Sequence, residues 1–372
     1  MTPAQKNFLV KSFFAVLFLV FFGIWCPRID WHLTGFDEWE LVHDFYYRSD
    51  IFRIFDFQML TYSRATNTYY MPLLTSLFDF SYSLSGGKTA PFYFFCFLMH
   101  GANAVIVYAL AQMTTGNKAA GILSTFMFMF HPANIPTTAW LAGIYSHTVS
   151  AFLYLLSLCF FIRFIRKKGG RGKQFFYLGC FSTFFAACLI KVLGLVLIPL
   201  FFLLEILLDT GKPPMKKAGS WQAIASWFDK YIPFFLSGLF FAGVAVLKYP
   251  NGSIARDWGG VSFSEFSLFR IMEFITWFFS PLYMYSNHSV NFVLLALVLT
   301  GIFLIWGDGK IRFLTVWTLL SLAPFSISNF RPLPILWRYL YHATVPLSIL
   351  TACLAVYFCS WFKQKVPLGN VP

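Results

Sequence analysis

The 372-residue chain is 58% hydrophobic and 21% aromatic, and only 12% of its residues are charged. Continuous apolar runs long enough to cross a bilayer, about 17–25 residues each, recur along nearly its whole length. This pattern excludes a soluble domain and lacks the alternation of a membrane β-barrel, so it predicts an all-α polytopic membrane protein. The net charge of +13 could suit nucleic acid. However, the basic residues gather at the ends of apolar runs, so no nucleic-acid partner is predicted.

The first apolar run, Phe8–Trp25, is followed by IWCPRIDW, which lacks the small residues of a signal-peptide cleavage site. We therefore expect an uncleaved first span. The segment after it, residues 26–90, holds eight of the fifteen acidic residues. Stretches such as WELVHDFYY predict short amphipathic helices on the membrane surface. We expect this segment to form a long first outer loop.

An acidic cluster, GFDEWELVHD at residues 35–44, stands out in so apolar a chain. Glu40 and Asp44 fit the charged face of a helix that begins near Asp37. Asp37 and Glu38 follow a Gly-Phe exit from the membrane, where a carboxylate can serve as general base or as metal ligand. If a metal is used, Mg²⁺ or Mn²⁺ held by these two carboxylates is the expectation, although the sequence requires no cofactor.

The basic clusters fix the predicted topology. They are RFIRKKGGRGK at 163–173, KPPMKK at 212–217, GDGKIR at 307–312 and FKQK at 362–365. Placed together in the cytoplasm by the positive-inside rule, they predict about ten spans, cytoplasmic N- and C-termini, and a non-cytoplasmic face with no net charge. Because the remaining ionisable groups concentrate on that outer face, we expect the protein to work there.

The rest of the chain predicts one transmembrane domain over residues 1–372, with no separate soluble domain. Residues 250–289 form a second outer segment, in which the run at 266–285 carries charges that favour an interfacial helix over a span. The apolar run Phe175–Leu208 has 34 residues and would extend about 50 Å as one helix, too long for one crossing. We therefore predict a hairpin that breaks near Lys191–Gly194.

Lys191 lies at this break, flanked by apolar residues. A cation there either extends its side chain to the interface or contacts an anionic headgroup. Arg331, Arg338 and Tyr339 fall in the last outer loop, where aromatic residues commonly anchor to the interface and two arginines could clamp a phosphate.

Three histidines, His100, His131 and His147, stand singly at the edges of predicted spans. Isolated histidines of this kind are commonly hydrogen-bonded structural residues, and metal ligation is the alternative. The seven cysteines are scattered without a CxxC pair, so neither disulfides nor a thiolate metal site is predicted.

Several short stretches occur in the order seen in one superfamily. They are YYMPL at 69–73, HGANA at 100–104, FHP at 130–132, WLAGIYSH at 140–147, LIKVLG at 189–194 and WRYLYHATVPL at 337–347. Together with Asp37 and Glu38 they resemble integral-membrane glycosyltransferases of the GT-C superfamily, especially the TMTC-like and bacterial O-mannosyltransferase-like members. The resemblance covers most of the chain and implies a GT-C-like helical bundle.

The resemblance also implies a function. Such enzymes use a polyprenyl-phosphate-linked sugar on the non-cytoplasmic side, with a protein or glycan as acceptor. Carried over by position, Asp37 would be the base or the carboxylate that positions the acceptor. The lipid phosphate would lie near Lys191, Arg338, Tyr339 and Arg331, and His100, His131 and His147 would line the donor and acceptor groove. The expected location is a bacterial inner membrane.

The chain departs from the superfamily pattern at several charged positions, which are Met71, Ile144, Ser146, Val192 and Trp337. These departures keep a second hypothesis open, a non-catalytic GT-C-like protein that binds lipid-linked glycan or a partner enzyme. A third hypothesis is a lipid or glycan transporter. It predicts two related halves and ionisable residues at mid-bilayer, and the sequence shows no internal repeat.

Overall fold

The computed structural model describes residues 3–25, 72–134, 137–138, 144–208, 228–248, 268–279, 290–325 and 340–365. All regular structure in these ranges is helical, as predicted. The long helices are α1 (Pro3–Trp25), α3 (Pro72–Ser85), α4 (Ala90–Thr115), α5 (Lys118–Phe130), α8 (Ser150–Arg166), α9 (Arg171–Ile190), α10 (Leu197–Leu208), α13 (Ile232–Lys248), α15 (Leu268–Phe279), α16 (Val290–Trp306), α17 (Gly309–Leu322) and α18 (Tyr341–Lys365). Short helical turns are η4 (Pro132–Asn134), η5 (Ile144–Val149), η6 (Val192–Val196) and η9 (Ala323–Phe325).

The helices have the length and composition of membrane spans. Within the described ranges, four are long and apolar enough to cross a bilayer: Ala90–Thr115, Ser146–Arg166, Arg171–Ile190 and Tyr341–Phe362. Shorter apolar helices accompany them, including Val10–Ile24 and Phe292–Trp306. The chain is therefore an integral membrane protein. The predicted number of about ten crossings stays a prediction.

Short turns join antiparallel neighbours. Between α4 and α5, Gly116 takes a left-handed conformation (φ 73°) that a residue with a Cβ adopts only under strain. Asn117 then caps α5, because its side-chain oxygen accepts hydrogen bonds from the backbone N–H groups of Ala119 (2.8 Å) and Ala120 (3.2 Å). The Gly-Asn pair thus ends one helix and starts the next within two residues.

Three such turns, residues 116–117, 167–170 and 307–308, meet at one end of the bundle, which we call the basic end. The Arg166 guanidinium donates a hydrogen bond to the Met113 carbonyl, and the Lys310 ammonium donates to the Thr115 carbonyl at 3.0 Å. The basic clusters at 163–173 and 307–312 are predicted to lie on the same side of the membrane. Both lie at this end of the helix bundle, as that prediction requires. Their placement in the cytoplasm stays a prediction, and the cluster at 212–217 lies outside the described residues.

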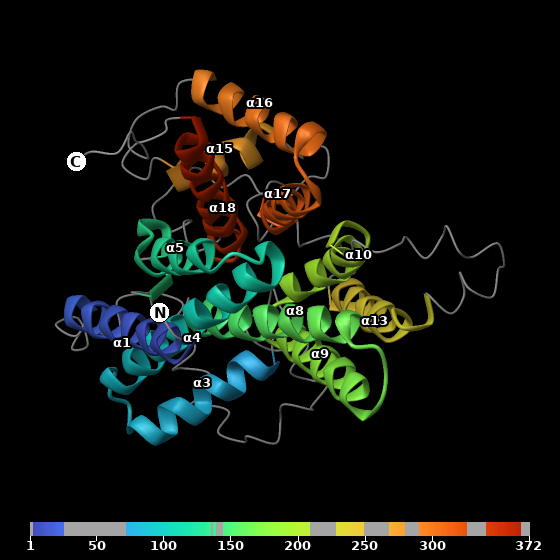
Figure 1. Cartoon of the computed structure of the whole chain (residues 1–372). Helices are drawn as coiled ribbons and strands as arrows, with labels where there is room; N and C mark the ends of the chain where they lie inside the picture. Colours follow the sequence, from blue (N-terminus) through green and yellow to red (C-terminus); the bar gives the residue numbers. More distant parts are fainter. Residues whose placement is uncertain are drawn as a thin grey trace.

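The predicted hairpin within Phe175–Leu208 is confirmed. Helix α9 ends at Ile190, Lys191 is extended (φ −157°, ψ 128°), and α10 begins after η6. Near the start of α9 the Tyr177 hydroxyl donates to the Lys230 carbonyl at 2.9 Å, and the Lys230 ammonium pairs with Glu205, late in α10. Since Lys230 contacts the start of one helix and the end of the other, α10 returns to the basic end. In Figure 1, α8 and α9 run side by side, with α10 and α13 next to them.

Gly194→Ala is expected to destabilise this hairpin. A Cβ at Gly194 would lie 2.8 Å from Cys188 Sγ, 3.0 Å from the Cys188 backbone nitrogen and 3.2 Å from the Ala187 carbonyl carbon. The backbone atoms cannot move without displacing the end of α9, so the loss should be about 1–3 kcal/mol, seen as a lower melting temperature in detergent.

Gly243→Ala is the matched control, because nothing lies within 4 Å of a Cβ built at Gly243 in α13. A helical alanine is neutral or stabilising where space allows. Equal melting temperatures for the two variants would contradict the close approach at Gly194.

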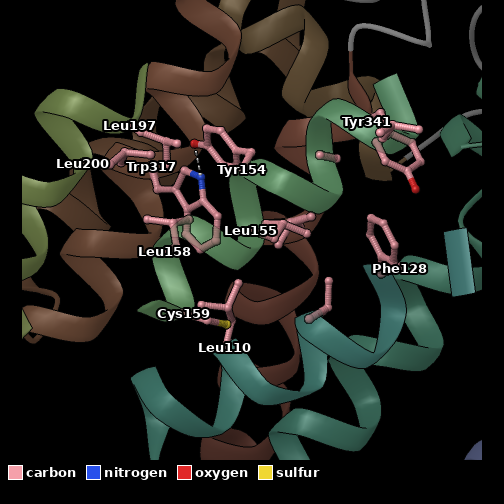
Figure 2. Packing of buried hydrophobic residues seen from close by; sticks show 14 of the residues in the cluster. Leu110, Phe128, Tyr154, Leu155, Leu158, Cys159, Leu197, Leu200, Trp317 and Tyr341 are labelled. Carbon is pink, nitrogen blue, oxygen red and sulfur yellow. Dashed lines mark hydrogen bonds between the residues drawn. The ribbon is translucent and has the colours of Figure 1, made fainter. Parts of the chain in front are cut away.

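The core at the middle of the bundle is aromatic. Trp317 of α17 and Tyr154 of α8 are both buried, and the indole N–H donates to the Tyr154 hydroxyl at 2.9 Å. Figure 2 shows this pair with Leu158, Leu197 and Leu200 around it. The hydrogen bond satisfies two polar groups that burial would otherwise leave unpaired, so α17 is fixed in register against α8.

The predicted run at 266–285 contains α15, a helix of 12 residues. At 1.5 Å per residue it extends about 18 Å, which is short of a crossing. Ile271, Met272 and Phe278 on it are buried. Whether the run crosses the bilayer and whether it lies at the outer interface both stay predictions, because residues 249–267 and 280–289 lie outside the described residues.

Candidate functional site

The candidate residues that the structure describes lie toward the end of the bundle opposite the basic end. Lys191 directly follows α9, which starts at the basic end, and His147 lies in η5, just before α8. His131 follows α5, and His342 is the second residue of α18. The start of α18 is held near the end of α5, since the Thr344 hydroxyl donates to Asn134 Oδ1 at 3.1 Å.

Lys191 contacts His147. The Lys191 ammonium nitrogen lies 3.0 Å from Nε2 and 3.2 Å from Nδ1 of the imidazole. An ammonium group only donates hydrogen bonds, so one nitrogen of His147 accepts and the ring is neutral in this contact. The imidazole is buried and belongs to a π-helix, a rare form that is frequent at functional sites. The contact holds a cation at the end of three packed helical elements, η5, α8 and α9.

His342 completes what we call the His–Lys cluster, consisting of His147, Lys191 and His342. Its ring centroid lies 6.2 Å from that of His147 and 5.4 Å from that of Tyr154. The residue is 2% exposed, and neither ring nitrogen has a hydrogen-bond partner among the described residues. Buried polar atoms without partners are costly and uncommon. Both nitrogens can therefore bind polar atoms of a ligand that enters the cluster.

A second polar network lies beside this cluster. His100 Nε2 bonds to the Met129 carbonyl at 3.1 Å, so it carries the proton, and Nδ1 accepts from the Tyr341 hydroxyl at 2.7 Å. Asn103 Nδ2 donates to the same hydroxyl at 3.1 Å and to the Thr148 carbonyl in η5 at 2.9 Å. The network therefore joins α4, η5 and α18, and it fixes the two elements that carry His147 and His342.

Tyr341→Phe tests this network. The change removes the hydroxyl that serves both His100 and Asn103, so the free energy of unfolding should fall by about 1–3 kcal/mol. A double-mutant cycle with Asn103→Ala, followed by thermal unfolding in detergent, measures the coupling. Strictly additive losses would contradict a shared hydrogen bond.

His131 is held by α15 instead. Its ring stacks on Phe278 with centroids 4.1 Å apart, and Nε2 donates to the Phe278 carbonyl at 2.8 Å. Nδ1 accepts from the Ala133 backbone N–H at 3.2 Å, so the ring is neutral. His131 directly follows the last residue of α5. These bonds fix α15 against the end of α5.

The structure thus brings together two of the predicted site residues, Lys191 and His147. It gives His100 and His131 protein partners at every ring nitrogen, and their roles in a groove stay predictions. The remaining predicted residues, Asp37, Glu38, Arg331, Arg338 and Tyr339, lie outside the described residues. Within the described part of the chain no group of three His, Cys, Asp or Glu side chains could hold a metal ion; a site on Asp37 and Glu38 stays a prediction.

His342, Asn103 and Tyr341 are not among the site residues predicted from the sequence. All three lie within the stretches HGANA and WRYLYHATVPL that resemble the superfamily, and this resemblance is the sequence feature that could have pointed to them. Tyr341 and His342 are both buried, at 0% and 2% exposure. Their neighbours come from α4, η5 and α8, which a local pattern does not reveal.

Comparison with solved structures identifies the fold. ArnT from Cupriavidus metallidurans, bound to undecaprenyl phosphate, superposes with a TM-score of 0.55 and 16% identity, over 96% of this chain and 62% of that one. An Archaeoglobus fulgidus oligosaccharyltransferase tethered to an acceptor peptide superposes with a TM-score of 0.54 and 15% sequence identity, over 98% of this chain and 51% of that one. The Archaeoglobus fulgidus oligosaccharyltransferase AglB, in complex with an inhibitory peptide and a dolichol-phosphate, superposes with a TM-score of 0.50 and 14% sequence identity, over 98% of this chain and 53% of that one.

ArnT and AglB are GT-C proteins, so the predicted GT-C-like helical bundle is confirmed. At these identities the likeness concerns the fold alone, and this chain spans only about half to three fifths of the length of those proteins. No protein-family model matches the chain, and no curated protein sequence matches it significantly.

Proposed function

We propose that the protein is a membrane glycosyltransferase that moves a sugar from a polyprenyl-phosphate-linked donor to a protein or glycan acceptor. The reaction would occur at the membrane face opposite the basic end. The observation that carries this proposal is Lys191, a cation held beside the buried His147 at that end of a GT-C-like bundle. A bacterial inner membrane with both termini in the cytoplasm is part of the same proposal.

Lys191 would stabilise the negative charge of the leaving group. As the bond between the sugar anomeric carbon and the phosphate oxygen breaks, negative charge develops on the polyprenyl phosphate. An ammonium group already in place stabilises that charge without reorganisation. His147 holds the ammonium at 3.0 Å, and the two unpaired nitrogens of His342 lie close by to contact phosphate or sugar oxygens. Solved structures of this fold include one bound to undecaprenyl phosphate and one bound to a dolichol-phosphate, which supports a lipid-phosphate ligand.

The acceptor side of the reaction is assigned from the sequence. An acceptor hydroxyl or amide attacks the anomeric carbon, and its proton passes to Asp37 as general base. Glu38 assists in positioning or, with Asp37, holds a divalent ion. Arg331, Arg338 and Tyr339 add contacts to the lipid phosphate. In this scheme one glycosidic bond forms, one sugar–phosphate bond breaks, and the polyprenyl phosphate leaves.

The experiment is transfer by the full chain in proteoliposomes, with a panel of radiolabelled polyprenyl-phosphate sugars and an extract of membrane glycans and proteins as acceptor. We expect label to leave the lipid fraction and to appear in the acceptor fraction. Consumption of nucleotide sugars in place of lipid-linked ones would contradict the proposal, as would net movement of intact donor across the bilayer without transfer.

A second candidate is a non-catalytic protein that binds lipid-linked glycan or a partner enzyme. Neutral residues at several superfamily charge positions, including Ile144 and Val192, favour it. The same proteoliposomes separate the two candidates. Saturable retention of the lipid-linked sugar with no transfer over any acceptor in the panel would support the binder and exclude the enzyme.

A further inference from the structure

A cavity of about 760 Å³ opens at the basic end, far from the His–Lys cluster. Its walls come from the end of α8, the start of α9 and the residue Lys230 ahead of α13. The lining residues are Phe164, Gly170, Arg171, Lys173, Gln174, Tyr177, Leu178 and Lys230. Its volume falls in the range of small-molecule sites, about 300–1,000 Å³. Three of the eight lining residues are cationic and none is acidic.

The cavity carries more positive charge than the carboxylates of the described residues neutralise. Lys230 pairs with Glu205, whereas no carboxylate of the described residues lies within salt-bridge distance of Arg171 or Lys173. The Lys173 ammonium lies 5.1 Å from the centre of the Phe164 ring, a cation–π contact that holds it at the wall. Helix α9 also starts here without a side-chain cap and without an acidic residue in its first turn. The positive end of the helix dipole thus adds to the two cations, and the cavity suits an anion.

The surface that continues from this cavity is apolar. Arg171, Phe175 and Leu178 occupy positions i, i+4 and i+7 of α9 and so lie on one face of the helix. Phe175 is 63% exposed and Leu178 is 62% exposed. A cation followed along the helix by exposed apolar side chains matches an amphiphile, with its headgroup at Arg171 and its hydrocarbon chain along Phe175 and Leu178.

We propose that this cavity binds the phosphate headgroup of an anionic phospholipid, with one acyl chain lying along α9. The site is separate from the proposed donor site. Helix α9 has 20 residues, so Arg171 and Lys191 are separated by about 30 Å, roughly the thickness of the bilayer core. The inference therefore stands without the transferase activity, and its test measures lipid binding and not transfer.

The test uses the full chain in detergent and measures retention of phosphatidylglycerol against phosphatidylcholine by native mass spectrometry over a lipid titration. The variant is Arg171→Gln with Lys173→Gln. The matched control is Lys167→Gln with Lys168→Gln, which removes two charges from the adjoining turn, where neither side chain is among those that line the cavity. We expect the cavity variant to weaken phosphatidylglycerol binding about 10- to 30-fold and the control to change it less than about 3-fold.

If both variants weakened phosphatidylglycerol binding equally, the proposal would be overturned. The lipid would then respond to the overall positive charge of the turn and not to the cavity. Inorganic phosphate and glycerol 3-phosphate form a second arm. If either binds as tightly as phosphatidylglycerol, or displaces it at equal concentration, the ligand is a soluble phosphate and the lipid assignment fails. Leu178→Gln, which leaves all cations in place, should weaken lipid binding and leave any soluble-phosphate binding unchanged.

Discussion

Lys191→Met is expected to lower sugar transfer about 10²- to 10³-fold. The chain should still fold, with a free energy of unfolding lower by about 1–3 kcal/mol because the buried His147 loses a hydrogen-bond donor. The methionine keeps the length of the side chain but removes the ammonium that stabilises the departing phosphate. Because that charge is larger in the transition state than in the bound donor, kcat should fall more than donor affinity. Initial rates of transfer in proteoliposomes, at saturating and at low donor concentration, separate the effect on kcat from the effect on donor affinity.

Lys191→Arg should restore part of the rate, since a cation remains, although the planar guanidinium does not reproduce the ammonium geometry. Lys118→Met is the control: it removes an exposed lysine at the basic end and should leave the rate within about 2-fold, as usual for exposed charges. The assignment fails if Lys191→Met and Lys118→Met, both folded, transfer at the same rate.

Asp37→Asn is expected to reduce transfer about 10²- to 10⁴-fold, because an amide cannot take the proton from the acceptor. Binding of the lipid donor should be retained, since the donor phosphate is assigned to other residues. The readout is transfer in proteoliposomes beside binding of the lipid-linked sugar by the same preparation.

Glu40→Gln is the matched control for that experiment. It removes a carboxylate three residues away in the same acidic cluster, one assigned to the charged face of a helix. Its transfer rate should stay within about 2-fold of that of the unsubstituted protein, because the sequence predicts Glu40 on the solvent-facing charged side of a helix, where substitutions rarely have large effects. A folded Asp37→Asn protein with full activity would remove Asp37 from the mechanism and would leave Glu38 as the acid to test.

The features that the sequence predicted well follow from length and charge. A 34-residue apolar run cannot be one crossing, and the lysine and glycine within it mark the break between α9 and α10. Basic residues at the ends of apolar runs predicted shared faces, and the bonds from Arg166 and Lys310 to the α4–α5 hairpin confirm a shared end. Each prediction needed only properties of neighbouring residues.

The features that it did not predict depend on contacts between distant residues. His100 and Tyr341 are 241 positions apart and bond at 2.7 Å, and His342 meets His147 across a helix interface. In an apolar bundle almost every residue suits a buried position, so the local pattern does not show which faces meet. The pairing of Lys191 with His147 likewise depends on how α8 packs on α9.

The most direct test of the account is a structure of the full chain with a non-hydrolysable polyprenyl-phosphate sugar in a lipid nanodisc. We predict that a phosphate oxygen lies at hydrogen-bond distance, about 2.7–3.2 Å, from the Lys191 ammonium, with an imidazole of the His–Lys cluster beside the sugar or phosphate. A donor phosphate in the cavity of Arg171 and Lys173, with no phosphate oxygen within hydrogen-bond distance of the Lys191 ammonium, would contradict the account.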